Sequence, residues 1–118
     1  MRPTLALAIA LLLFSGSGIA QAAGPAQLAE TAGFLLGNAH RCGVSTERVG
    51  HAGKVIHDLI GAASDDRTEE EAADRRFVEV FMASAYPDRD GNALVPPCSV
   101  VIAQFERLER HHQQAGMN

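Results

Sequence analysis

The sequence predicts an all-α domain, an up-down-up-down bundle of four helices stapled by one disulfide. Four segments place apolar residues at helical spacing, and none alternates with the period of a half-buried strand over a useful length. The chain has two cysteines, Cys42 and Cys98, so their connectivity is forced. They fall at the end of the first expected helix and at the start of the fourth, which an alternating bundle brings to the same end.

The first 22 residues have the three parts of a secretory signal peptide. Arg2 supplies the positive charge, Leu5 to Phe14 is an apolar run, and Ala20-Gln21-Ala22 has the small residues that a signal peptidase accepts. The run is shorter than the roughly 20 residues that a membrane-spanning helix needs. We therefore expect cleavage after Ala22, which leaves residues 23–118 as a single periplasmic or secreted domain without a membrane span.

The first helix is expected over about residues 25–42. Pro25 suits the first turn of a helix, where its missing N–H is not needed. Gly43 can take the left-handed conformation that ends a helix, with Val44 in the apolar position after it. Between these ends, apolar residues form one stripe: Leu28, Ala32, Leu35, Leu36, Ala39 and Cys42.

The second helix is expected over residues 46–63. Ser45 before it is a good N-cap, because its hydroxyl can accept a hydrogen bond from the first turn. The regular apolar spacing makes this the clearest helix in the sequence. Its expected core stripe is Val49, Ala52, Val55, Ile56, Leu59, Ile60 and Ala63.

The third helix is expected over about residues 69–86. Thr68 and Glu71 have the spacing of a capping box, and the acidic run from Asp65 to Glu71 suits the positive end of the helix dipole. Pro87 disfavours helical geometry in the residue before it, so the helix should end near Tyr86.

The fourth helix is expected over about residues 97–112, with fraying after His111. Its expected apolar face carries Cys98, Val101, Ile102, Phe105 and Leu108. In an oxidising compartment we expect the Cys42–Cys98 pair to be a structural disulfide, because a redox motif of the C-x-x-C type is absent from the sequence.

The formal net charge is −4 at pH 7 with the histidines neutral. Nucleic acids and anionic membranes need a basic surface, so neither is an expected partner. The turn Asp88-Arg89-Asp90-Gly91-Asn92 begins like a calcium loop, but Pro97 stands where the loop needs a bidentate glutamate. We interpret this segment as an Asp-Gly turn.

No catalytic, cofactor-binding or metal-binding residue is predicted. Ser45 and Ser64 lie at helix ends, where capping explains them. No two histidines have the i,i+4 spacing that would place both on one helical face. The five histidines are therefore expected at the surface or at helix ends: His40, His51, His57, His111 and His112.

The third helix has an apolar arc of roughly 200°, wider than the stripe of an ordinary surface helix. Phe77 and Val80 belong to its core side. Val78, Met82 and Ala85 continue toward the opposite side and are the candidate interface residues. The alternative is that neighbouring helices and the following loop wrap this helix on all these sides.

The order of Leu36-Gly37-x-x-His40-x-Cys42, the stretch from Phe81 to Tyr86, and Cys98 before an amphipathic helix resembles a family of small exported alphaproteobacterial proteins of unknown function. It is also loosely similar to periplasmic immunity proteins, which neutralise toxins delivered by neighbouring cells and usually carry more cysteines. Neither resemblance implies a catalytic residue.

We expect a small exported helical protein that acts through contact with a protein partner or a second copy of itself, and not an enzyme. The alternative is a periplasmic bundle that binds a small ligand or a metal.

Overall fold

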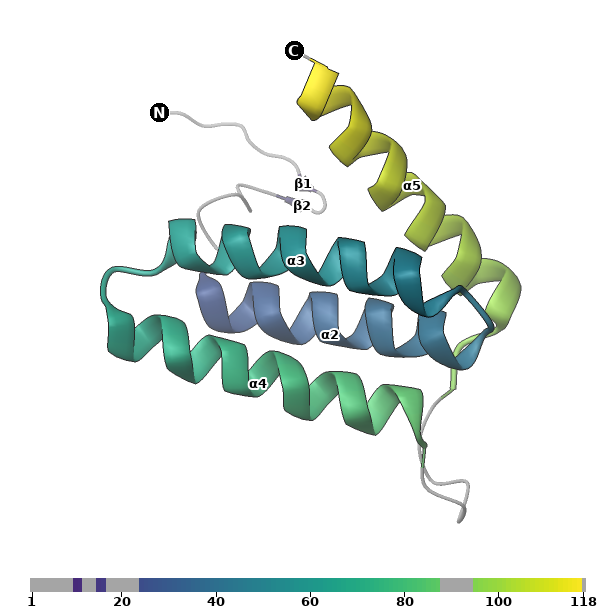
Figure 1. Ribbon diagram of the computed structural model, residues 1–118, viewed down its shortest axis with the longest axis horizontal. Coiled ribbons are helices and arrows are strands. Elements are labelled where there is room, and N and C mark those ends of the chain that lie inside the picture. Colours follow the sequence, from purple (N-terminus) through teal and green to yellow (C-terminus); the bar gives the residue numbers. More distant parts are fainter. Residues whose placement is uncertain (1–9, 12–14, 17–23, 88–94, 118) are drawn as a thin grey trace.

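The computed structural model describes residues 10–11, 15–16, 24–87 and 95–117. Their fold is all-α, as predicted, with helices α2 (Pro25–Arg41), α3 (Thr46–Ala63), α4 (Arg67–Ala85) and α5 (Cys98–Met117) (Figure 1). Two strands of two residues each, β1 (Ala10–Leu11) and β2 (Ser15–Gly16), pair antiparallel within the predicted signal peptide. The helix bounds lie within two residues of the expected ones, except at the end of α5.

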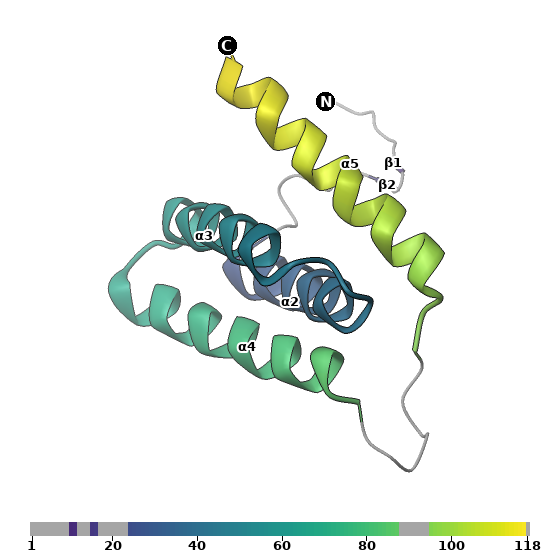
Figure 2. The ribbon, with the colours of Figure 1, turned by 45° about the vertical axis from the view of Figure 1, so that its right-hand side comes forward.

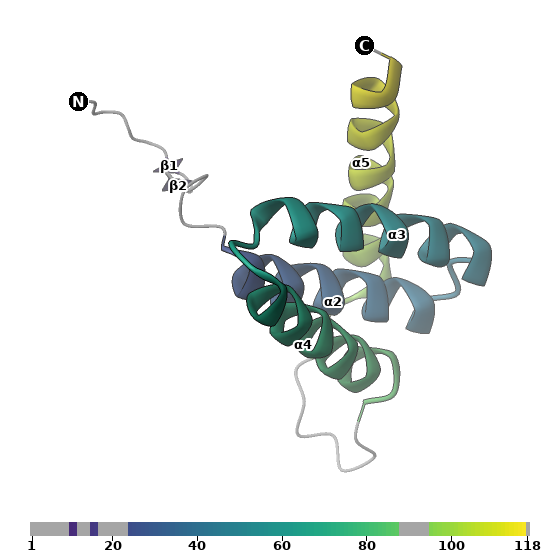
Figure 3. The same ribbon diagram turned by 60° about the vertical axis from the view of Figure 1, so that its left-hand side comes forward.

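Helix α2 lies between α3 and α4 and also contacts α5 (Figures 1 and 3). It is therefore the centre of the fold, and the other helices pack around it. The largest fully buried side chains come from three different helices: Leu36 of α2, Ile60 of α3 and Phe105 of α5. Around them lies the rest of the core, which includes Ala29, Ala32, Ala39, Val49, Ala52, Ile56, Ala73 and Val101.

Two glycines of α2 bring its backbone against that of α4. A Cβ atom at Gly33 would lie 2.8 Å from the carbonyl oxygen of Phe77, and one at Gly37 would lie 2.5 Å from the carbonyl oxygen of Phe81. Real Cβ atoms essentially never come this close to a backbone oxygen. The packing of α2 on α4 therefore requires glycine at both positions.

The turn between α2 and α3 has the geometry that the sequence predicted. Gly43 has a φ of +94°, and the backbone N–H of Val44 donates to the carbonyl of Ala39 at 3.0 Å, which is the long hydrogen bond of a Schellman motif. Ser45 then caps α3, because its hydroxyl accepts from the backbone N–H of Arg48 at 3.2 Å.

The cap of α4 differs from the predicted pairing of Thr68 with Glu71. The N-cap is Asp66, whose carboxylate accepts from the backbone N–H of Glu69 at 2.8 Å. The Glu69 carboxylate in turn accepts from the backbone N–H of Asp65 at 2.6 Å. Aspartate is a better N-cap than threonine, so the helix starts at the earlier of the two candidate pairs. At its other end α4 stops at Ala85, with Tyr86 as C-cap before Pro87, as expected.

The predicted disulfide joins the end of α2 to the start of α5. The Cα atoms of Cys42 and Cys98 are 5.5 Å apart. Arg41 reinforces this junction, because its guanidinium donates to the carbonyl of Pro96 at 2.9 Å and to Oδ1 of the buried Asn38 at 3.0 Å. The chain just before α5 is thus held to α2 by a covalent bond and by hydrogen bonds.

Helix α5 leans across the other helices instead of lying alongside them. α2, α3 and α4 alternate in direction, whereas the C-terminal turns of α5 extend away from the three on the side opposite α4 (Figures 2 and 3). Its anchors lie near the disulfide end: Val101 and Phe105 are buried, and Glu109 pairs with Arg48 in the first turn of α3. The sequence predicted Leu59 in the core stripe of α3, but this side chain is 46% exposed, because α5 diverges from the second half of α3.

Helix α5 is also longer than expected. The sequence predicted an end near residue 112, but the helix continues to Met117. Gln113, Gln114 and Ala115 favour helix, and neither proline nor glycine interrupts the chain before Gly116. Local propensity therefore extends the helix beyond the part that packs on the core.

Candidate functional site

A groove runs between α3 and α4, with α2 at its floor. Helices α3 and α4 form the two walls of the groove, and they are held apart because α2 packs between them. The main part of the groove has a volume of about 340 Å³, and a second hollow of about 340 Å³ continues it toward Asp74. Both parts share Gly53, Phe77 and Val78 in their lining. The groove is mostly apolar, and it is open along its length.

The α3 wall contains glycines at two places where the fold does not need them. Among the described residues, no atom lies within 4 Å of a Cβ built at Gly50, and a Cβ at Gly53 would meet only Leu36, at an ordinary 3.9 Å. Each glycine inside a helix costs about 1 kcal/mol relative to alanine. Gly50 and Gly53 therefore differ from Gly33 and Gly37, which the α2–α4 contact requires.

Two of the three predicted interface residues lie on the exposed side of α4. Val78 lines the groove and is 56% exposed. Met82, one turn later, is 50% exposed and lies beyond the groove lining. Ala85, which was expected with them, is instead buried at 6% exposure. The reason is the close approach of α4 to Gly37, which draws the last turn of α4 down onto α2.

Aromatic side chains form one end of the groove. The ring of His40 lies 6.1 Å from that of Phe81 and 5.9 Å from that of Tyr86, measured between centroids. The Tyr86 hydroxyl and Nε2 of His40 are 3.4 Å apart, so a long hydrogen bond links α2 to the C-cap of α4. The sequence predicted Tyr86 only as a helix end, but the structure makes it part of the groove.

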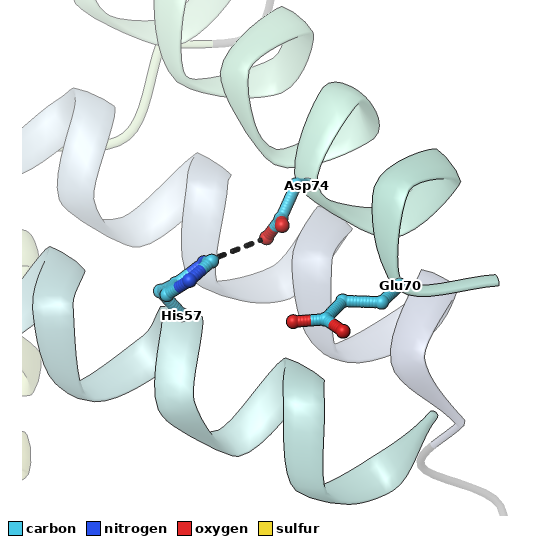
Figure 4. A group of neighbouring side chains, drawn as sticks. All are labelled: His57, Glu70 and Asp74. Carbon is cyan, nitrogen blue, oxygen red and sulfur yellow. Dashed lines mark hydrogen bonds and ion pairs between the residues drawn. The ribbon is translucent and has the colours of Figure 1, made fainter. Parts of the chain in front are cut away.

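Charged side chains lie at the other end of the groove. His57 of α3 faces Glu70 and Asp74 of α4, which are one helical turn apart (Figure 4). The Nδ1 atom of His57 is 3.1 Å from Oδ1 of Asp74. One ligand atom from each of the three residues lies within 4.8 Å of the other two. The groove therefore has mostly apolar side chains along its length and acidic side chains at one end.

The charged end favours the protonated form of the His57 imidazole. The hydrogen bond from His57 to Asp74 raises the pKa of His57 above its ordinary value, and the charges of Asp74, Glu70 and Asp58 act in the same direction. All three partners are acidic, so the electrostatic effect favours a cation at this place. The side chain of His57 is largely exposed, so salt weakens this effect.

This cluster was not predicted from the sequence, because the histidines were compared only with one another. Glu70 was assigned to the acidic run at the start of the helix, and its i,i+4 relation to Asp74 was not considered. The register of α3 against α4, which places His57 opposite them, follows from the packing of both helices on α2. A search that paired each histidine with acidic i,i+4 pairs on other helices would have found it.

Two other histidines also come together across helices. The rings of His51 on α3 and His112 on α5 are 6.0 Å apart. They line a small hollow with Glu109, whose carboxylate is already engaged by the guanidinium of Arg48. The ion pair lowers the pKa of Glu109, since Arg48 donates hydrogen bonds to the ionised carboxylate.

The serines have the capping roles that the sequence analysis assigned to them. Ser45 caps α3 at its start, and the hydroxyl of Ser64 donates to the carbonyl of Ile60 at its end, at 2.6 Å. The Asp88–Asn92 turn lies outside the described residues.

Comparison of the chain with family models, curated proteins and solved structures gives no match. Within the described residues, no helix has the length and apolar character that crossing a membrane requires.

Proposed function

We propose that this domain is an exported binding protein that holds an α-helix of a partner protein in the groove between α3 and α4. The observation that carries the proposal is the pair Gly50 and Gly53. Both glycines lower helix stability, and the described part of the chain places nothing against them that would clash with a side chain. A closely packed helix from outside gives a reason for glycine at both positions.

The groove has the chemistry that an amphipathic helix recognises. Apolar residues at i, i+3, i+4 and i+7 of such a helix need a long apolar groove, and the two connected hollows provide one. Val78 offers an exposed apolar contact on one wall, and the exposed Met82 follows it one turn later on α4. Gly50 and Gly53 allow close backbone approach on the other wall. A small ligand is a poorer fit, because pockets for small molecules enclose most of the ligand surface.

Charge favours a different protein over a second copy of this chain. The chain carries a formal charge of −4, so two copies repel each other. Glu70 and Asp74 at one end of the groove would attract basic residues in a bound helix. We therefore assign the groove to a partner helix that is apolar along one face and basic at one end.

Export rests on two independent observations. The first 22 residues match a signal peptide, and Cys42 is bonded to Cys98. Disulfides persist in oxidising compartments such as the periplasm. The proposed site of action is therefore the periplasm or the cell exterior.

The test compares tagged forms of the mature domain purified from the native cell envelope. Val78→Glu places a charge in the groove lining, and Met82→Glu places one on the exposed surface of α4 one turn later, so we expect both to lose the co-purifying protein while they keep the helical circular dichroism spectrum. Ala83→Glu is the matched control, because Ala83 is exposed on α4 but lines a different hollow, with Arg76 and Val80. Equal recovery of the partner with all three variants would contradict the proposal.

Val80→Asp is the folding control for these variants. Val80 is half-buried, and its Cβ would lie 3.1 Å from a Cβ at Gly33, so it packs against α2. A carboxylate there would replace an apolar side chain in the contact of α4 with α2, so we expect Val80→Asp to destabilise the domain strongly. If Met82→Glu unfolds the domain as strongly as Val80→Asp does, the outer side of α4 is core and the interface assignment fails.

A further inference from the structure

We propose that His57, Glu70 and Asp74 form a binding site for a divalent transition-metal ion of the zinc class. The three residues come from two helices and converge at the charged end of the groove (Figure 4). No motif of the sequence predicts this site, and it does not depend on the proposed partner helix.

The distances between the ligand atoms suit one ion. In a tetrahedral site with bonds of about 2.0–2.2 Å, neighbouring ligand atoms lie about 3.4 Å apart. Nδ1 of His57 and Oδ1 of Asp74 are already 3.1 Å apart, and one ligand atom of Glu70 lies within 4.8 Å of both. The proposed site requires the Glu70 carboxylate to move closer to both, and the Glu70 side chain has several rotatable bonds.

The backbone around the cluster leaves room for this arrangement. Glu70 and Asp74 lie one turn apart on α4, so their carboxylates project from the same side of the helix. Opposite them, α3 has Gly61 one turn after His57. A Cβ atom at Gly61 would lie 3.1 Å from Oε2 of Glu70, so the Glu70 carboxylate lies close against the backbone of α3 beside His57.

The set of ligand atoms selects the class of metal. One imidazole nitrogen with two carboxylate oxygens suits zinc and its first-row neighbours, whereas calcium and magnesium prefer oxygen alone. The two carboxylates balance the charge of a divalent cation. Both cysteines are in the disulfide, so the site has no thiolate. With three protein ligands, at least one coordination position is left for water or for a group from a bound protein.

The chain contains a competing pair of ligands, His51 and His112, whose rings are 6.0 Å apart. Imidazoles alone also bind zinc, so the test must separate the two places. Glu109, which lines the same hollow as this pair, is held by Arg48 and is less available to a metal. We therefore assign the main site to the cluster with His57.

The test is calorimetric titration of zinc chloride into the mature, disulfide-bonded protein, residues 23–118, in metal-free buffer near pH 7.5. We expect binding with one ion per chain at the His57 site. His57→Gln and Asp74→Asn should each weaken it at least tenfold. His51→Gln with His112→Gln is the matched control and should leave this binding event unchanged. All four positions are partly or largely exposed, so circular dichroism should show an intact fold in every variant.

The proposal is overturned if the wild-type protein does not bind zinc. It is also overturned if the variant with both His51→Gln and His112→Gln loses zinc binding while His57→Gln keeps it. If the wild-type protein binds two ions and His57→Gln removes one of them, the proposal holds. Met82→Glu should leave the zinc titration unchanged, so failure of the groove proposal and failure of the metal site can be told apart.

Discussion

Gly37 of α2 lies directly against the backbone of Phe81 in α4, so closely that a Cβ atom at Gly37 would come within 2.5 Å of the Phe81 carbonyl oxygen. This contact joins the central helix to α4 through backbone atoms. It leaves the other side of α4, with Val78 and Met82, facing outward. The same close approach that stabilises the core therefore also exposes one wall of the groove.

Gly37→Ala should destabilise the domain, because its methyl group would overlap a backbone oxygen that side-chain rotation cannot move. We expect a loss of about 2–3 kcal/mol in the free energy of unfolding. Gly50→Ala is the matched control, since the described residues leave a Cβ there free of contacts. It should raise stability by up to about 1 kcal/mol. Urea titration followed by circular dichroism measures both, and equal effects would disprove the distinction between these glycines.

Replacing Cys42 and Cys98 together by serine should lower stability and keep the helices. The disulfide closes a loop with a sequence separation of 56 residues. In the chain-entropy model, a loop of this length contributes about 4 kcal/mol, mainly by restricting the unfolded chain. The hydrogen bonds of Arg41 to Asn38 and Pro96 should still hold the start of α5 near α2. An unchanged denaturation midpoint would mean that the disulfide has no structural role.

The exported protein should begin at Ala23 and contain no free thiol. Ala20-Gln21-Ala22 is the predicted cleavage site, and the two cysteines are bonded to each other. Intact-mass measurement of the protein from the cell envelope, with alkylation in the absence of reductant, tests both points. A mass that includes residues 1–22, or the addition of two alkyl groups, would refute this prediction.

The pKa of His57 should lie above the ordinary histidine value of about 6.5, because its ring donates to Asp74. A raised pKa in the folded state adds stability below the unfolded pKa, and this stability disappears as the pH rises through the folded pKa. Asp74→Asn should therefore destabilise the protein at pH 5.5 more than at pH 8.5, by less than about 1 kcal/mol for so exposed a pair. Titration of the ring by NMR should show the pKa falling in Asp74→Asn. An identical pKa in both proteins would exclude the interaction.

Local signals in the sequence were sufficient for most of the fold. The end of α2 at Gly43, the cap at Ser45 and the stop before Pro87 depend on residues close together in the chain, and each lies where the sequence predicted it. The disulfide was predictable because two cysteines allow one pairing. The predicted cap of α4 was wrong because Asp66 and Thr68 each begin a possible capping pair. The helix uses Asp66, which is the better N-cap of the two.

The features that escaped prediction depend on the relative placement of helices. The tilt of α5, which exposes Leu59, follows from anchors concentrated at the disulfide end. The burial of Ala85 follows from the close approach at Gly37. The meeting of His57 with Glu70 and Asp74 depends on the register of two helices that both pack on a third. Periodicity within one helix contains none of this information.

The most direct test of the partner-helix proposal is photo-crosslinking from the groove in the native cell. Benzoylphenylalanine placed at Val78 should yield one discrete adduct with a different protein, whereas the same probe at Ala83 should yield none. Gly53→Leu should abolish the Val78 adduct, because the leucine side chain would fill the groove. The fold should tolerate this change, since a Cβ at position 53 meets only Leu36, at an ordinary 3.9 Å. The partner-helix proposal is contradicted if the probe at Val78 gives no discrete adduct, or if the probe at Ala83 gives the same adduct. It is also contradicted if Gly53→Leu leaves the Val78 adduct intact, or if the mass of that adduct is the mass of two copies of this chain.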